Sequence, residues 1–226
     1  MAKRKPRPKP KQNPKPPPAA TDEEVRALLR RYHCPVPFHA VRTRFLGTIA
    51  TPAMQTAPIE TLSALWRGKL PVFDTLDDAN DLFGALMMGL WNRLCRHQER
   101  SAPFHLTRID VPVTREGLVT LARVRQEELD GFIEGLFGAH ESLDFPERAN
   151  KALAALAEIR GMVGGVREIA GDPGKPATPA DVAATLGHLR EFTRIAEHEM
   201  HELVLSCTRA RRQMLRSMPA AKPVVH

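Results

Sequence analysis

A run of apolar residues near the C-terminus constrains the fold more than any other feature of the sequence. Its members are spaced four and three residues apart, with a polar break at Thr193: Val182, Leu186, Leu189, Ala196, Met200, Leu203, Cys207, Ala210 and Met214. This spacing places them on one face of an α-helix. Thr178 and Pro179 are suited to begin it, so the sequence predicts a long amphipathic helix over residues 179–217. Its apolar face must pack on the rest of the chain or on a second copy, and the second case predicts a homodimer.

The remainder of the chain also has a helical pattern. Val, Ile, Tyr and Thr never form the alternating runs that are typical of strands. Helix-starting residues such as Thr21, Pro58, Thr75 and Thr114 precede stretches with helical spacing. The expected helices cover residues 21–32, 39–52, 57–69, 76–98, 114–138 and 146–159, with a separate short one over 161–171. We therefore predict an all-α fold with a helical domain over 21–170, a linker over 171–178, the long helix, and a disordered end over 218–226.

The N-terminal segment carries all of the net charge. Residues 1–20 hold seven cations and no acid: Lys3, Arg4, Lys5, Arg7, Lys9, Lys11 and Lys15. Because the whole chain has a net charge of +7, the rest of it is electrically neutral. The segment is rich in proline and has little apolar surface to bury, so we expect a disordered, extended tail. Without aromatic residues it would contact the phosphates of a nucleic acid rather than its bases, and the alternative is a tail that only tethers or solubilises.

Three glycines lie in the stretch "EELDGFIEGLFGAHESL", residues 127–143. Gly131, Gly135 and Gly138 are spaced four and three apart, whereas a dinucleotide-binding loop requires G-x-G-x-x-G after a strand. The Gly-Lys-Ser/Thr of a nucleotide-binding P-loop is also absent from the sequence. Glycines at this spacing share a helical face and let a second helix approach closely. We therefore predict that all three serve helix packing.

Several weak motifs in a fixed order resemble the YecA/YgfB family of bacterial proteins. They comprise Phe45, Leu46, Pro52, Pro58, Leu65, Trp66, Gly68, Trp91 and Asn92, followed by Gly131, Phe132 and Gly135. The resemblance covers residues 40–160, and Arg44 stands where the family usually has glycine. It implies an all-helical cytoplasmic bacterial protein with no established reaction. We also predict that Trp66 and Trp91 serve helix packing. Longer members end in a cysteine-rich zinc motif, but this chain has a single cysteine after Ser206, so zinc-mediated partner binding does not transfer.

The candidate metal ligands lie in "EHEMHE", residues 197–202. His198 and His201 are three apart, so one helix face can hold both, but the zinc-protease motif H-E-x-x-H requires histidine where Glu202 stands. No histidine has glutamate three residues before it, which excludes a carboxylate-bridged di-iron bundle. Relative to the apolar face both histidines are expected on the solvent side. We therefore predict no native metal site and keep this pair as the weak candidate.

Two further groups of polar residues have ordinary explanations. A mixed Cys/His zinc site would require His33, Cys34 and His39 to meet Cys95 and His97, and the last two point apart on a helix. The acids Glu127, Asp130 and Glu134 share a helical face, which we expect to be solvated. The sequence lacks the G-x-S-x-G motif of serine hydrolases.

Together these observations predict a non-enzymatic helical adaptor or regulatory protein without a cofactor. It would bind an unknown protein partner through helix faces and use the basic tail as a tether. The alternative is a nonspecific nucleic-acid or ribosome-associated protein that acts through residues 1–20. A minor alternative is a metal-dependent hydrolase that uses the histidines. The longest apolar run, residues 82–91, is too short to span a membrane, and the odd number of cysteines favours the cytoplasm.

Overall fold

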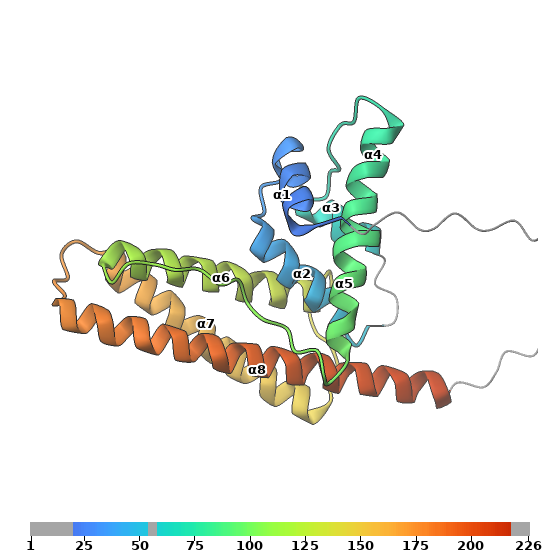
Figure 1. Cartoon of the computed structure of the whole chain (residues 1–226). Helices are drawn as coiled ribbons and strands as arrows, with labels where there is room; N and C mark the ends of the chain where they lie inside the picture. Colours follow the sequence, from blue (N-terminus) through green and yellow to red (C-terminus); the bar gives the residue numbers. More distant parts are fainter. Residues whose placement is uncertain (1–19, 54–57, 218–226) are drawn as a thin grey trace, which may run out of the picture.

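The computed structural model describes residues 20–53 and 58–217, and these form an all-α fold without β-strands (Figure 1). The helices are α1 (Asp22–Arg31), α2 (Phe38–Ala50), α3 (Pro58–Leu65), α4 (Leu76–Phe83), a wide π-helical stretch η1 (Gly84–Trp91), α5 (Asn92–Cys95), a 3₁₀ turn η2 (Arg96–Gln98), α6 (Arg115–Phe137), α7 (Glu147–Gly171) and α8 (Pro179–Ser217). The predicted all-α class and the long C-terminal helix are confirmed. No helix of the described part is long and apolar enough to cross a membrane.

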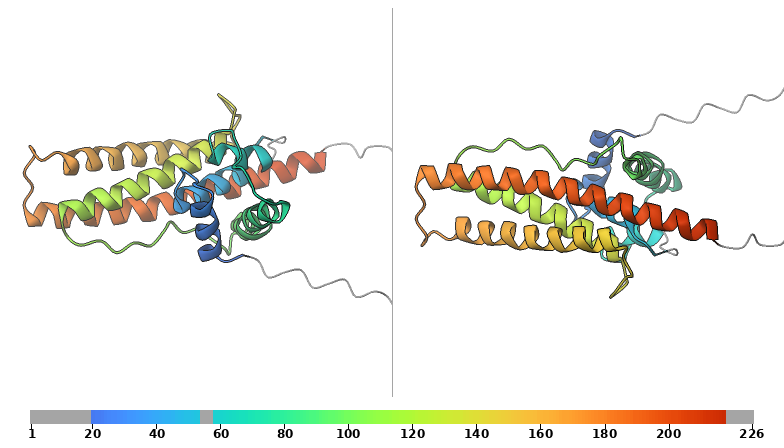
Figure 2. Two further views of the ribbon diagram at one scale, coloured as in Figure 1. Left: turned by 90° about the horizontal axis from the view of Figure 1, so that it is seen from above. Right: turned by 90° about the horizontal axis from the view of Figure 1, so that it is seen from below.

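The three longest helices lie side by side and form an elongated bundle, while the shorter N-terminal helices gather at one end of it (Figures 1 and 2). The helices α7 and α8 are antiparallel and are joined at the other end by residues 172–178. The last part of α8 passes beneath the N-terminal helices, where it contacts α2 and η2. The bundle therefore runs from the N-terminal helices at one end to the connection between α7 and α8 at the other.

The closest approach between helices is that of α2 and α6, and glycines make it possible. A Cβ atom added to Gly135 would overlap the main-chain oxygen of Arg44, and one added to Gly131 would lie 2.6 Å from the oxygen of Ala40. On the opposite helix, Gly47 has the same role against α6. Two backbones at this distance exclude any side chain between them, which explains three glycines inside helices.

The third predicted packing glycine has a different place. Gly138 follows the end of α6 with a φ of +55°, and nothing lies within 4 Å of an added Cβ. Its amide donates a hydrogen bond to the oxygen of Glu134 at 2.8 Å. The prediction of helix packing is therefore wrong for Gly138, because this glycine supplies the left-handed backbone that ends the helix.

Both tryptophans link N-terminal elements to one another. Trp66, just after α3, donates from Nε1 to the main-chain oxygen of Tyr32 at 2.8 Å. Trp91, at the end of η1, packs edge-on against Phe45 of α2, with ring centroids 5.4 Å apart. Both rings are half-buried, so they help fix α3 and η1 to α1 and α2.

The apolar face of α8 is covered by the chain itself. Its residues from Val182 to Cys207 are at most 4% exposed, and the helix packs on α7 and α6 and then on α2 and η2. Met214, at the end of the face, is 49% exposed. Since the body covers this face, the reason for expecting a homodimer through α8 no longer applies.

One helix boundary and one helix type differ from the prediction. The separate helices expected over 146–159 and 161–171 are one continuous helix, α7. Each glycine in this region lowers helix propensity by about 1 kcal/mol, but Leu156, Ile159 and Val163 are buried across the expected break and hold α7 together. The helix expected over 76–98 has the predicted ends, but it contains the π-helical stretch η1 from Gly84 and ends in a 3₁₀ turn.

Candidate functional site

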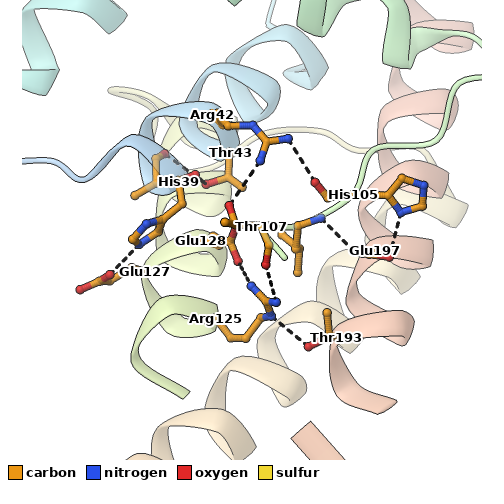
Figure 3. A network of polar contacts seen from close by, with 12 residues as sticks. His39, Arg42, Thr43, His105, Thr107, Arg125, Glu127, Glu128, Thr193 and Glu197 are labelled. Carbon is orange, nitrogen blue, oxygen red and sulfur yellow. Dashed lines mark hydrogen bonds and ion pairs between the residues drawn. The ribbon is translucent and has the colours of Figure 1, made fainter. Parts of the chain in front are cut away.

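A buried network of polar contacts joins the segment between η2 and α6 to three helices (Figure 3). At its centre lie Arg125 and Glu128 of α6, which form an ion pair and are 6% and 0% exposed. Glu128 also accepts the amide of Thr107 at 2.7 Å. Arg125 donates from Nη2 to the oxygen of Thr107 at 2.7 Å and from Nε to Thr193 of α8 at 3.0 Å.

The outer part of the network continues along the same segment. Arg42 of α2 donates to the main-chain oxygen of His105 at 3.2 Å and to the hydroxyl of Thr107 at 3.3 Å. Burial lowers the pKa of Arg42 from its usual value. Glu197 of α8 accepts the amide of Leu106 at 2.9 Å and lies 3.0 Å from Nδ1 of His105.

The arrangement of these groups fits anchoring better than proton transfer. Both oxygens of Glu128 and all three guanidinium nitrogens of Arg125 already have hydrogen-bond partners. A buried ion pair satisfied in this way fixes geometry, while its net stabilisation is small because both charges are desolvated. The network therefore fixes the path of an extended segment across α2, α6 and α8.

The acids expected on a solvated face of α6 each contact a basic side chain of another helix. Glu127 lies 2.6 Å from Nε2 of His39, Asp130 pairs with Arg160 of α7, and Glu134 pairs with Arg44 of α2. Glu134 is exposed as predicted, whereas Glu127 and Asp130 are half-buried, because α2 and α7 supply polar neighbours that no local pattern reveals.

The two candidate metal ligands do not face the same environment. His198 is exposed, whereas His201 is 9% exposed, and its Nδ1 is buried without a hydrogen-bond partner among the described residues. The expectation that both face solvent is wrong for His201, because α8 is contacted on more than one side where it passes η2 and α2. Within residues 20–53 and 58–217, no three metal-ligating side chains gather into a group.

The three cysteines are free thiols in separate places. Cys34 and Cys95 are half-buried, and Cys34 donates a long hydrogen bond to the oxygen of Leu65 at 3.8 Å. Cys207 is fully buried, and desolvation raises the pKa of its thiol to about 11. His39 and His97, proposed as partners of Cys34 and Cys95, bond instead to Glu127 and to the oxygen of Ala102.

An apolar groove, which we call the α7–α8 groove, lies between α7 and α8 on the described surface. Its volume is about 580 Å³. Its apolar lining comprises Leu118 of α6, Met162, Val166, Ile169 and Ala170 of α7, and Val182 and Phe192 of α8. Met162 and Ile169 are 43% and 56% exposed. The volume and the apolar lining are those of binding sites in proteins.

An arginine at the groove joins the start of α6 to the end of α7. Arg115, at the start of α6, donates to the oxygens of Ala170 at 3.1 Å and Lys175 at 2.8 Å, which fixes the end of α7 and the connection to α8. Gly165 lines the wall, and neither it nor Gly161 has anything within 4 Å of an added Cβ. These glycines therefore have no packing partner within the described chain, unlike Gly131 and Gly135.

Comparisons with protein-family models, curated proteins and solved structures gave no match. The resemblance to the YecA/YgfB family therefore stays a prediction. The predicted tether residues Lys3, Arg4, Lys5, Arg7, Lys9, Lys11 and Lys15, and the end over 218–226, lie outside the described residues.

Sequence reasoning missed both the network and the groove. The sequence offered one signal for the groove, the run "GMVGGVREIAG", where apolar residues and glycines alternate inside a helix. The sequence offered no signal for the network, because Arg125 and Glu128 look like ordinary surface residues on a charged helix.

Proposed function

We propose that the protein is a non-enzymatic helical adaptor that binds an amphipathic helix of a partner protein in the α7–α8 groove. The observation that carries this proposal is the groove itself, which is largely apolar, lies between antiparallel helices and is open to solvent. A bound helix would take the fourth position beside α6, α7 and α8, as in four-helix bundles. The basic N-terminal segment would act as an electrostatic tether.

The glycines of α7 support a helical occupant rather than a compact small molecule. Gly161 and Gly165 are one turn apart on the same side of α7, and each weakens the helix by about 1 kcal/mol without serving internal packing. A helix that docks there gains from their small size, because its backbone can approach closely. Met162 and Ile169 beside them supply the apolar contacts.

The test is site-specific photo-crosslinking in living cells. A benzophenone amino acid at position 162 is expected to give one discrete covalent adduct with a protein, and the same probe at exposed Arg30 of α1 is expected to give none. Adding Gly165→Leu to the first protein should abolish the adduct by filling the groove. Capture of a protein that survives Gly165→Leu would contradict the proposal.

A matched control separates occupancy of the groove from folding. Gly187 of α8 is an exposed helical glycine that, like Gly165, has nothing within 4 Å of an added Cβ, but it does not line the groove. Gly187→Leu and Gly165→Leu should both leave the melting temperature unchanged or raise it. Only Gly165→Leu should remove the adduct.

A further inference from the structure

We propose that a second surface, at the opposite end of α8, binds the phosphate backbone of nucleic acids without reading their sequence. Arg100, Arg209, Arg212 and Arg216 surround a shallow hollow of about 290 Å³. Gln98 and Gln213 add neutral hydrogen-bond donors to its lining. We call this surface the basic hollow.

The hollow combines two segments that are distant in sequence. Arg209, Arg212 and Arg216 are spaced three and four apart, so they share one face of α8, and Arg100 comes from the turn after η2. Arg212 forms an ion pair with Glu99 at 3.1 Å. The other three arginines are exposed and form no ion pair with any described residue, so their charges are available to a ligand.

The helix dipole does not account for this grouping. Cations are favourable within the last turn of a helix, and that explains Arg216. Arg209 lies about two turns before the end of α8, and Arg100 is not on the helix at all. Arg211 has its own structural task, since it donates to the oxygens of Ile49 at 2.7 Å and Thr51 at 3.3 Å and so caps α2.

The distribution of acids makes the local charge positive although the body is neutral. No Asp or Glu follows Glu202 in the sequence, while four arginines and Lys222 do. Glu99 is the single carboxylate in the lining of the hollow, and it is already paired. Four arginines around one acid leave a net charge of +3 on a concave surface.

The polar lining favours a phosphate backbone over a membrane surface. Membrane-binding helices set apolar residues beside their cations, but Leu205 is the only apolar residue that lines the hollow. Leu215, which is 55% exposed, lines a different hollow with Trp91 and Arg211. Arginine forks match phosphate oxygens in geometry, and the absence of aromatic side chains from the lining leaves no platform for bases.

The experiment measures binding of the full chain to labelled single-stranded RNA and duplex DNA by fluorescence anisotropy between about 50 and about 150 mM salt. The test variant replaces Arg100, Arg209 and Arg216 with Gln. The control variant replaces Arg30, Arg108 and Arg190 with Gln, which are three exposed arginines elsewhere that also form no ion pair with a described residue. Both variants lose the same net charge and keep the N-terminal cations.

We expect the test variant to lower the slope of log affinity against log salt by about 2 for single-stranded RNA. Its affinity at low salt should fall at least about tenfold, while the control variant changes the affinity far less. The difference in affinity between the test and control variants should persist when the seven N-terminal cations are also replaced with Gln. Unchanged melting temperatures show that the folded surface is intact in each variant.

Three outcomes would overturn the proposal. The first is an equal loss in the test and control variants, which would indicate an effect of net charge alone. The second is absence of binding by the full chain at low salt. The third is binding to phosphatidylglycerol vesicles that depends on the three arginines while neither nucleic acid binds. Each outcome leaves the α7–α8 groove unaffected, because the crosslinking test probes the other end of the bundle.

Discussion

The main-chain oxygen of Arg44 in α2 occupies the place where any side chain at Gly135 in α6 would begin. The two helices therefore meet backbone to backbone, and the contact cannot be kept if position 135 carries a Cβ atom. Gly161 in α7 is also inside a helix, but nothing lies near its added Cβ. The same substitution should thus have opposite effects at the two positions.

Gly135→Ala is expected to destabilise the protein by at least about 3 kcal/mol, because helix backbones have to separate. Gly161→Ala should stabilise it by up to about 1 kcal/mol through helix propensity. Urea unfolding followed by circular dichroism gives both values. Equal stability changes at the two positions would show that the close contact between α2 and α6 is absent.

Arg125→Met is expected to cost about 3–5 kcal/mol, because the substitution leaves the carboxylate of Glu128 buried without its cation. The double variant Arg125→Met, Glu128→Met should recover part of this loss. Arg123→Met is the control, since Arg123 pairs with Glu127 on an exposed part of the same helix, and it should change stability by less than about 0.5 kcal/mol. Unfolding free energies of these three variants and the unchanged protein test the expectation, and a double variant no more stable than Arg125→Met would contradict it.

Local chemistry predicted the helix beginnings well. Thr21, predicted to begin a helix, forms a capping box with Glu24, and Thr75 and Thr114 accept the amides of Asp78 and Gly117. The spacing of apolar residues predicted α8, and Thr178 and Pro179 predicted where it begins. These features depend on residues three to seven apart, which a sequence displays directly.

What could not be predicted depends on partners distant in sequence. Glu128 binds the amide of Thr107, and Arg125 reaches Thr193, 68 residues further on. The burial of His201 follows from contacts of α8 on more than one side, whereas a single apolar face implies only one. The α7–α8 groove likewise requires three helices at fixed positions, so no single segment carries its signature.

Cys207 is expected to resist thiol reagents in the folded protein. Its thiol is fully buried and its pKa is about 11, so at pH 8 only about one molecule in a thousand carries the reactive thiolate. Burial also raises the pKa of Cys34 and Cys95, but these side chains are half-buried and should react faster. Alkylation with iodoacetamide followed by peptide mass spectrometry measures each rate. Labelling of Cys207 at the rate of Cys95 would contradict its buried position.

Acid is expected to destabilise the junction between η2 and α8 through His97. This side chain is buried, and desolvation lowers its pKa below the usual 6.5. The nearby Arg42, Arg96 and His201 lower the pKa further, while the hydrogen bond to the oxygen of Ala102 raises it. The unfolded state then binds more protons than the folded state once the pH falls below about 6.5, so the free energy of unfolding declines as the pH drops through and below that value. The stability that neutral His97 provides should therefore be fully present at neutral pH.

His97→Asn, whose side-chain amide keeps a donor for the oxygen of Ala102, should flatten this decline, and His198→Asn at an exposed position should not. Melting temperatures of the unchanged protein and the two variants between about pH 5 and pH 8 test this role of His97. An equally steep decline in all three proteins would assign the acid sensitivity to other groups.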